Sequence, residues 1–163
     1  MVKKVAPKEP SSKNLTLKNF SVLADVSKDQ GKLREAEELF RAAIAGKGKV
    51  LGRDHPETLN SLHSLALVLE ARRNFSESEN VFQDALIAKE RMLGPTNEST
   101  CVTAFCLGDL YRKLSRYNDA LKMYHYAYEG YVQSYGENHK YTKLVAMRIK
   151  TVEREKNSHC IIL

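Results

Sequence analysis

The chain has 163 residues, of which 42% are apolar and 28% are charged, and its formal net charge at pH 7 is +6. This composition is typical of a globular domain large enough to form a real core, and it excludes a low-complexity or collagen-like chain. No run of residues approaches the roughly 18–20 consecutive apolar positions that a membrane-spanning helix requires.

The N-terminal residues 1–13 contain four lysines and one glutamate and show no apolar periodicity. We predict a disordered basic tail here, and the lack of an apolar stretch argues against a secretory signal. Residues 142–163 also have a net charge of +3, so the body between the two ends is neutral. A nucleic-acid surface needs Lys and Arg concentrated on one folded face, and no nucleic-acid partner is therefore expected.

Residues 14–156 repeat themselves with a period of 42 residues. A fixed period of 20–50 residues is typical of stacked supersecondary units, which present an extended surface to a partner. Four series of residues recur at this spacing: Gly52, Gly94 and Gly136; Ala43, Ala85 and Ala127; Leu23, Leu65 and Leu107; and Phe40, Phe82 and Tyr124.

Each period accommodates two helices. Apolar residues in 59–69 recur at steps of three and four, which predicts one face of a helix, and a second helix follows the polar turn at 72–74. An unpaired helix after the last unit is expected to cover its apolar face. The predicted units are 14–51, 56–93 and 98–135, and the predicted cap helix is 139–156.

Small residues mark the places where helices come close. Ala24, Ala66 and Gly108 are predicted to lie where the two helices of a unit approach each other. The first unit departs from the pattern of the others, because Ser27 stands where an apolar residue is expected. Gly46-Lys47-Gly48 is predicted to interrupt the second helix of that unit, since glycine is a poor helix former.

The junctions between units contain signals that end one helix and begin the next. Gly52 and its two counterparts are predicted to adopt a left-handed C-terminal cap. Asp54 or His55 is the predicted N-cap of the following helix, with Pro56 in its first turn. Asp54-His55 could also suggest catalysis, but the equivalent pairs at 96–97 and 138–139 fit the capping role equally well. No catalytic residue is therefore predicted.

Cysteines and histidines are few and scattered. The three cysteines form no C-x-x-C pair and the five histidines form no tight pair, so no metal site is expected. An odd number of cysteines without an export signal favours a reduced compartment, and we expect a cytoplasmic protein. Gly-rich phosphate loops and nucleophile elbows do not occur in the sequence. The prediction is a non-enzymatic protein with no cofactor and no small-molecule substrate.

The second unit resembles a tetratricopeptide repeat, and the period of 42 residues and the junction LGRDHPETL are similar to the kinesin light chain subtype. The resemblance covers about residues 14–156 and implies an all-α tetratricopeptide-repeat α-solenoid, with three helical hairpins plus a C-terminal capping helix. The chain lacks the long heptad region of a kinesin light chain, so a fragment of a larger kinesin light chain-like protein is an alternative. The residues that match the repeat are Leu65, Ala66, Leu69, Ser78, Phe82 and Ala85.

In this family the first helix of each unit lines a concave groove that binds extended peptides. The resemblance therefore implies a protein-interaction adaptor that binds a peptide segment of a partner protein. Two alternatives are a solvated concave face without a dedicated ligand and a structural homo-oligomer that pairs through apolar surface of the first unit. The predicted groove positions are Asn60, His63, Leu67, Val102, Phe105, Asp109, Arg112 and Met147, with Lys18, Ser21 and Asp25 in the first unit.

Residues 157–163 are predicted to be a flexible tail that ends in Cys160-Ile161-Ile162-Leu163. A cysteine followed by two branched aliphatic residues and a final leucine matches the C-a-a-X pattern for geranylgeranylation. We therefore expect a geranylgeranyl group on Cys160. A single prenyl chain anchors reversibly, and the basic residues in 142–156 would add attraction to anionic lipid on a cytoplasmic membrane face.

Overall fold

The computed structural model describes residues 12–161, with side chains described for residues 20–158. This part of the chain forms seven helices and no strand. Long segments of helical apolar periodicity, separated by short polar turns, account for this outcome. The helices are α1 (Ser12–Asp29), α2 (Leu33–Val50), α3 (Pro56–Ala71), α4 (Phe75–Leu93), α5 (Glu98–Lys113), α6 (Tyr117–Tyr135) and α7 (Lys140–Ile161).

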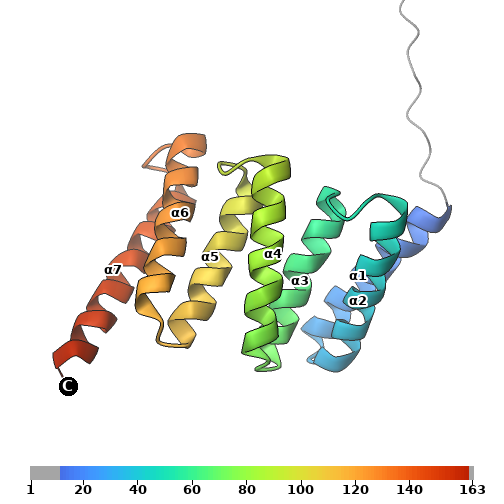
Figure 1. Cartoon of the computed structure of the whole chain (residues 1–163), viewed down its shortest axis with the longest axis horizontal. Helices are drawn as coiled ribbons and strands as arrows, with labels where there is room; N and C mark the ends of the chain where they lie inside the picture. Colours follow the sequence, from blue (N-terminus) through green and yellow to red (C-terminus); the bar gives the residue numbers. More distant parts are fainter. Residues whose placement is uncertain (1–11, 162–163) are drawn as a thin grey trace, which may run out of the picture.

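The helices are arranged in two rows (Figure 1). Helices α2, α4 and α6 form the front row, and α1, α3, α5 and α7 lie behind them. Short turns join α1 to α2, α3 to α4 and α5 to α6 into hairpins, and α7 packs against α6. Contacts run mainly between neighbours in sequence, as in a solenoid. The predicted all-α architecture of three hairpins and a C-terminal helix is confirmed.

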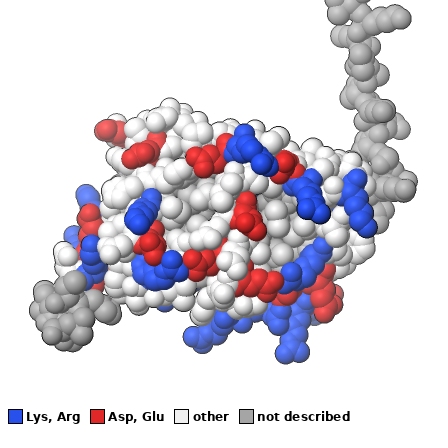
Figure 2. Space-filling view, in the orientation of Figure 1, with Lys and Arg blue, Asp and Glu red and all other residues white. Residues whose placement is uncertain are grey.

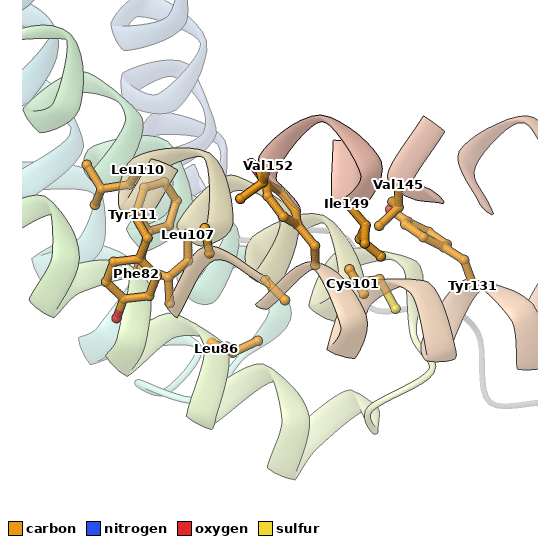
Figure 3. Close-up of a cluster of buried hydrophobic side chains, with 14 of the residues drawn as sticks. Phe82, Leu86, Cys101, Leu107, Leu110, Tyr111, Tyr131, Val145, Ile149 and Val152 are labelled. Carbon is orange, nitrogen blue, oxygen red and sulfur yellow. The ribbon is translucent and has the colours of Figure 1, made fainter. Parts of the chain in front are cut away.

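The C-terminal part of the core lies between the last hairpin and α7 (Figure 3). Val145, Ile149 and Val152 of α7 are 1%, 8% and 0% exposed, and they belong to the same buried cluster as Leu107 and Tyr131. Burial of apolar surface stabilises the fold by roughly 25 cal/mol per Å². The face that α7 buries is therefore what holds this unpaired helix on the array.

The small residues predicted at the helix crossings are fully buried. Ala24 and Ala66 have no exposed surface. At Gly108, an added Cβ would lie 2.8 Å from the ring of Tyr124, closer than side chains approach in real structures. The prediction that these three positions serve close helix packing is confirmed.

The N-caps of α3, α5 and α7 are built in the same way. His55 Nδ1 accepts the backbone N–H two residues further on at 3.2 Å, and Asn97 Oδ1 does the same at 2.9 Å. His139 Nδ1 repeats this contact at 3.4 Å. Asp54 instead forms an ion pair with Arg91 at 2.7 Å. The alternative that His55 is the N-cap of α3 is confirmed, and both members of Asp54-His55 have structural partners.

The glycines at the junctions have positive φ but differ from the predicted left-handed cap. Gly94 has φ 88° and ψ 162°, and Gly136 has φ 82° and ψ 167°. A left-handed helical residue would have ψ near +47°. The observed combination is accessible essentially to glycine alone. Glycine is therefore required at these positions. The reason is that the chain leaves the helix in an extended conformation, and not that it forms a left-handed cap.

One predicted helix interruption and one predicted helix end are wrong. Helix α2 continues through Gly46-Lys47-Gly48 to Val50, although each glycine costs about 1 kcal/mol relative to alanine in a helix interior. Burial of the apolar side chains of Phe40 and Ala43 against neighbouring helices offsets that cost. Helix α7 continues to Ile161, past the predicted end at 156. No glycine or proline lies in 157–161 to stop it, so these residues of the predicted flexible tail are helical.

The outer face of α1 differs from the equivalent faces of α3 and α5. Leu23 belongs to the same 42-residue series as Leu65 and Leu107, but it is 51% exposed, whereas Leu65 and Leu107 are 3% and 1% exposed. The preceding hairpin covers Leu65 and Leu107, and no described residue covers the same face of α1. Val22 and Val26, at 63% and 45% exposure, extend this apolar face.

Candidate functional site

Three cavities lie along the row formed by α1, α3, α5 and α7. The Lys47 cavity has a volume of about 200 Å³ and is lined by Ser21, Asp25, Phe40, Lys47, Glu57, Asn60, Ser61 and Ser64. The Lys89 cavity has a volume of about 510 Å³ and is lined by Asn60, His63, Ser64, Lys89, Asn97, Glu98, Ser99 and Val102. The Arg112 cavity has a volume of about 280 Å³ and is lined by Leu67, Glu70, Cys106, Asp109, Arg112, Lys113 and Arg148.

The Lys89 cavity contains a buried ammonium group. Lys89 extends from α4 between α3 and α5 and is only 2% exposed. Its Nζ donates to the hydroxyl of Thr103 at 3.0 Å and to the carbonyl of Ser99 at 3.4 Å. Thr103 Oγ1 also lies 3.1 Å from Nδ1 of His63. The polar groups of three helices therefore converge at one end of this cavity.

The Lys47 cavity repeats this arrangement one period earlier. Lys47 is 5% exposed, and its Nζ donates to Ser61 Oγ at 3.0 Å and to the Glu57 carbonyl at 3.5 Å. It also donates to Ser21 Oγ at 2.8 Å, at the position that His63 occupies in the next unit. Two consecutive units thus bury a lysine against hydroxyl and carbonyl oxygens.

The third unit replaces the lysine by an aromatic residue. Tyr131 stands one period after Lys89, and Val145 stands one period after Thr103. Tyr131 and Val145 are 3% and 1% exposed and belong to one apolar cluster (Figure 3). The same place in the fold is therefore compatible with an apolar filling.

Burial changes the protonation of the groups in the Lys89 cavity. It lowers the pKa of Lys89 to about 8, against a smaller opposing effect of Cys106. Burial also lowers the pKa of His63 to about 4, with added repulsion from Lys89 and Lys28. At neutral pH the lysine is therefore mainly cationic while the imidazole is neutral.

In the Arg112 cavity, ion pairs between helices already engage the charged groups. Arg112 Nε donates to Glu155 of α7 at 2.8 Å, and a second guanidinium nitrogen reaches the other carboxylate oxygen. Asp109 accepts from the hydroxyl of Tyr124 at 2.6 Å and lies 3.3 Å from Nε of Arg148. Two nitrogens of the Arg112 guanidinium group are therefore already engaged, and an incoming acidic side chain would compete with Glu155 for this charge.

Two models of the tetratricopeptide repeat match the sequence, one at residues 15–91 and the other at residues 106–140. The protein contains tetratricopeptide repeats. The three helical hairpins and the row of cavities are therefore those of a tetratricopeptide array. A search of curated proteins found no match to the chain.

Solved structures with the same fold include the TPR-like repeats of a kinesin light chain protein from Podospora anserina, with a TM-score of 0.74, 19% identity and coverage of 84% of this chain. A variant of that same protein gives the same values. BtubC (BKLC) from P. vanneervenii has a TM-score of 0.69 and 16% identity over 91% of this chain and 67% of its own. The present chain spans 65% of the length of the first two.

The array brings some of the predicted groove residues together and separates others. Phe105 and Met147 line none of the three cavities; Phe105 packs against Tyr124 with ring centres 5.5 Å apart, and Met147 is 59% exposed on α7. The side chains of Lys18 and Cys160 lie outside the described ones. The remaining positions divide among the three cavities. Ser21, Asp25 and Asn60 line the Lys47 cavity, and Asn60, His63 and Val102 line the Lys89 cavity. Leu67, Asp109 and Arg112 line the Arg112 cavity.

The two buried lysines of the tetratricopeptide array were not predicted from the sequence. Lys47 and Lys89 are one period apart, as are their partners Ser61 and Thr103. This recurrence was the available signal, but a lysine in an amphipathic helix is ordinarily placed on the solvent side. Contacts between helices, not helical periodicity, determine that these lysines are buried.

On the opposite side of the array, charges of both signs are interspersed. Figure 2 shows Lys, Arg, Asp and Glu side chains mixed over the face formed by α2, α4 and α6. Ion pairs on this side include Arg116 with Glu79 at 2.8 Å and Arg41 with Glu37 at 2.9 Å. Such exposed pairs contribute roughly 0.2–1 kcal/mol each, and they form no patch of a single sign.

Two further searches concern only the described residues. No group of three or more His, Cys, Asp or Glu side chains there is placed to hold a metal ion. No helix in that part of the chain is long and apolar enough to span a membrane.

Proposed function

We propose that this tetratricopeptide array is a non-enzymatic adaptor that binds an extended peptide segment of a partner protein along α3 and α5. The observation that supports this proposal is the continuity of the Lys47 and Lys89 cavities, which share Asn60 and Ser64. A peptide lying across these two residues would reach both cavities. Tetratricopeptide arrays generally mediate protein–protein interaction through an extended concave surface of this kind.

The centre of the proposed peptide site is α3 and α5, and α7 is its edge. Asn60, His63 and Val102 line the largest of these three cavities, whereas Arg112 at the other end is engaged by Glu155. A peptide that contacts Asn60, His63 and Val102 would not have to displace Glu155 from Arg112. The predicted roles of Asn60, His63 and Val102 in peptide binding are therefore retained in this proposal ahead of that of Arg112.

Selection from a phage-displayed library of random peptides tests the proposal. Asn60→Arg should weaken the selected peptides by tenfold or more, because a bulky side chain at an exposed position would fill the mouths of both cavities. Ile87→Arg is the matched control, since Ile87 is 64% exposed on α4 and lines none of the cavities. Peptides that bind both variants as tightly as the native protein would place the binding surface elsewhere and contradict the proposal.

A second candidate function is a homo-oligomer joined through α1. The apolar side chains Val22, Leu23 and Val26 are 63%, 51% and 45% exposed on one helix, which favours this candidate. We expect native protein to associate with rising concentration in sedimentation velocity, and Leu23→Asp to abolish association. Ile87→Asp, on another exposed apolar side chain, should leave it unchanged. A native protein that sediments as a monomer at all concentrations would rule this candidate out.

Membrane tethering through Cys160 stays a prediction from the C-a-a-X pattern. Helix α7 continues through Cys160 to Ile161, so the last turn would have to unwind before a transferase could bind the end in extended form. In a prenylating cell, we expect the native chain to partition onto membranes and Cys160→Ser to remain in the soluble fraction. Mass spectrometry of the C-terminal peptide should show the added geranylgeranyl mass. Equal partitioning of the two proteins, with an unmodified thiol, would contradict the prediction.

A further inference from the structure

One face of α7 is a stripe of exposed and mainly basic side chains. At 3.6 residues per turn, the positions 143, 147, 150 and 154 share one face of the helix, because they follow one another at steps of four, three and four residues. These positions are exposed and hold Lys143, Met147, Lys150 and Arg154. Lys140, exposed in the first turn of α7, adds a fourth cation beside them. We call these five residues the α7 stripe.

The four cations of the α7 stripe form no ion pair with a carboxylate of the described side chains. The charged residues on another face of α7 are paired with α5 instead: Glu155 with Arg112, and Arg148 with Asp109 at 3.3 Å. Glu153 is exposed beside the stripe. The glutamates that alternate with basic residues in the sequence are therefore mostly removed from this face by folding, and its charge is predominantly positive.

The α7 stripe corresponds to the face of α5 that α6 covers. Lys143 and Lys150 stand one period after Cys101 and Gly108. Both α5 residues are buried because α6 packs there, and an added Cβ at Gly108 would lie 2.8 Å from the ring of Tyr124. A helix packed on α7 in the same way would bury two unpaired ammonium groups, which is energetically unfavourable. This face is therefore suited to a partner that supplies negative charge, and not to another repeat helix.

We propose that the α7 stripe docks on an anionic lipid surface, with its cations against the headgroups and Met147 inserted between them. Clusters of Lys and Arg on an amphipathic helix attract anionic lipid, and exposed apolar side chains among them enter the interface. Met147 and the neighbouring Leu144 are 59% and 41% exposed, and these apolar side chains favour a membrane over an acidic polypeptide.

The shape of the stripe also fits a flat surface. It extends about 16 Å from position 143 to position 154, at about 1.5 Å per residue, and α7 is the last helix at one end of the array (Figure 1). Because its members are exposed, no other described element stands between the stripe and a membrane. The proposed docking requires neither a bound peptide nor a prenyl group.

The first arm measures co-sedimentation of the full chain with lipid vesicles, in a Cys160→Ser background so that no prenyl group contributes. Vesicles of phosphatidylcholine with about 40% phosphatidylserine should bind the protein, and vesicles of phosphatidylcholine alone should not. Lys143→Glu combined with Lys150→Glu should lower the partition coefficient by about tenfold or more. Lys32→Glu combined with Lys122→Glu is the matched control, because it changes the net charge equally at exposed positions outside α7. It should retain most of the binding.

The second arm distinguishes a membrane from an acidic polypeptide. The chain has no tryptophan, so Met147→Trp places a single fluorescent reporter in the stripe, and Ile87→Trp places one at an exposed position of α4 as the control. The anionic vesicles should shift the emission of Met147→Trp to shorter wavelength, and brominated lipid should quench it, because the side chain enters the interface. The emission of Ile87→Trp should not change. Polyglutamate at the same concentration of charge should shift neither reporter.

Three results would overturn the proposal. The first is a chain that binds neither kind of vesicle, or both kinds equally. The second is binding to anionic vesicles that the charge reversals at Lys143 and Lys150 reduce no more than the control pair does. The third is binding of polyglutamate without binding of vesicles, which would assign the stripe to an acidic polypeptide. None of these results affects the proposed peptide-binding function, which concerns α3 and α5.

Discussion

Gly108→Ala is expected to lower the free energy of unfolding by about 2 kcal/mol. Comparison with the other units alone would instead suggest that alanine stabilises the protein at this position. The equivalent residue of the second unit is Ala66, which is fully buried, and alanine is the better helix former. At Gly108, however, an added Cβ would lie 2.8 Å, 2.9 Å and 3.2 Å from three ring atoms of Tyr124. Overpacking of this kind costs about 1–3 kcal/mol, and urea denaturation followed by circular dichroism measures it.

The tyrosine hydroxyl explains why the ring cannot move away. Tyr124 OH donates to Asp109 at 2.6 Å, whereas the equivalent ring of the second unit, Phe82, has no hydroxyl. Tyr124→Phe should therefore reduce the cost of Gly108→Ala, with a coupling energy of about 1 kcal/mol in a double-mutant cycle. Gly48→Ala is the control, because its Cβ would meet only Arg53 at 3.7 Å, and it should be neutral or stabilising. Equal costs in the presence and absence of the hydroxyl would contradict this explanation.

Lys89→Met is expected to raise the free energy of unfolding at neutral pH by about 2 kcal/mol, because it removes a buried charge and keeps a side chain of similar length. Burial lowers the pKa of Lys89 from 10.5 to about 8 in the folded protein. Between these values the unfolded chain binds more protons, so the stability of the native protein should rise with pH from about 8 to 10.5. The variant should lack that part of the rise, and urea denaturation of both proteins across this range measures the difference.

The imidazole of His63, near Lys89, makes the stability of the folded protein depend on pH in the acidic range as well. Burial lowers the pKa of His63 from 6.5 to about 4, so the contribution of its neutral form is fully present above pH 6.5 and is lost as the pH falls toward 4. Because the charge of Lys89 contributes to this shift, Lys89→Met should also make the loss at low pH smaller. An unchanged profile between pH 4 and 6.5 in Lys89→Met would show that the two groups are not coupled.

Most of the fold could be predicted from local signals. The helices α3, α4, α5 and α6 occupy the predicted ranges 56–93 and 98–135, because apolar periodicity, capping residues and junction glycines all act within a few residues of the chain. The prediction failed in α2, where tertiary burial of Phe40 and Ala43 outweighs two glycines. The repeat also does not account for the exposure of Leu23, whose equivalents are buried by a preceding hairpin that α1 lacks among the described residues.

The candidate site was predicted less completely. The family resemblance assigned Asn60, His63 and Val102 to the first helices of the units, and the structure shows that they line one cavity. It gave no account of Lys89, which comes from the other row and reaches the cavity between two helices. It also treated Arg112 as available, although Glu155 of α7 holds it.

The sequence by itself therefore determined the number of units, their hairpins and their caps, because these depend on interactions between residues close together in the chain. Only the tertiary structure decided which charged groups are buried and which are already paired. The partners of Lys89, Arg112 and Asp109 include residues 10 to 43 positions away, and most of these contacts join different helices. Which side chains meet in them depends on how the helices pack against one another, which no local pattern in the sequence records.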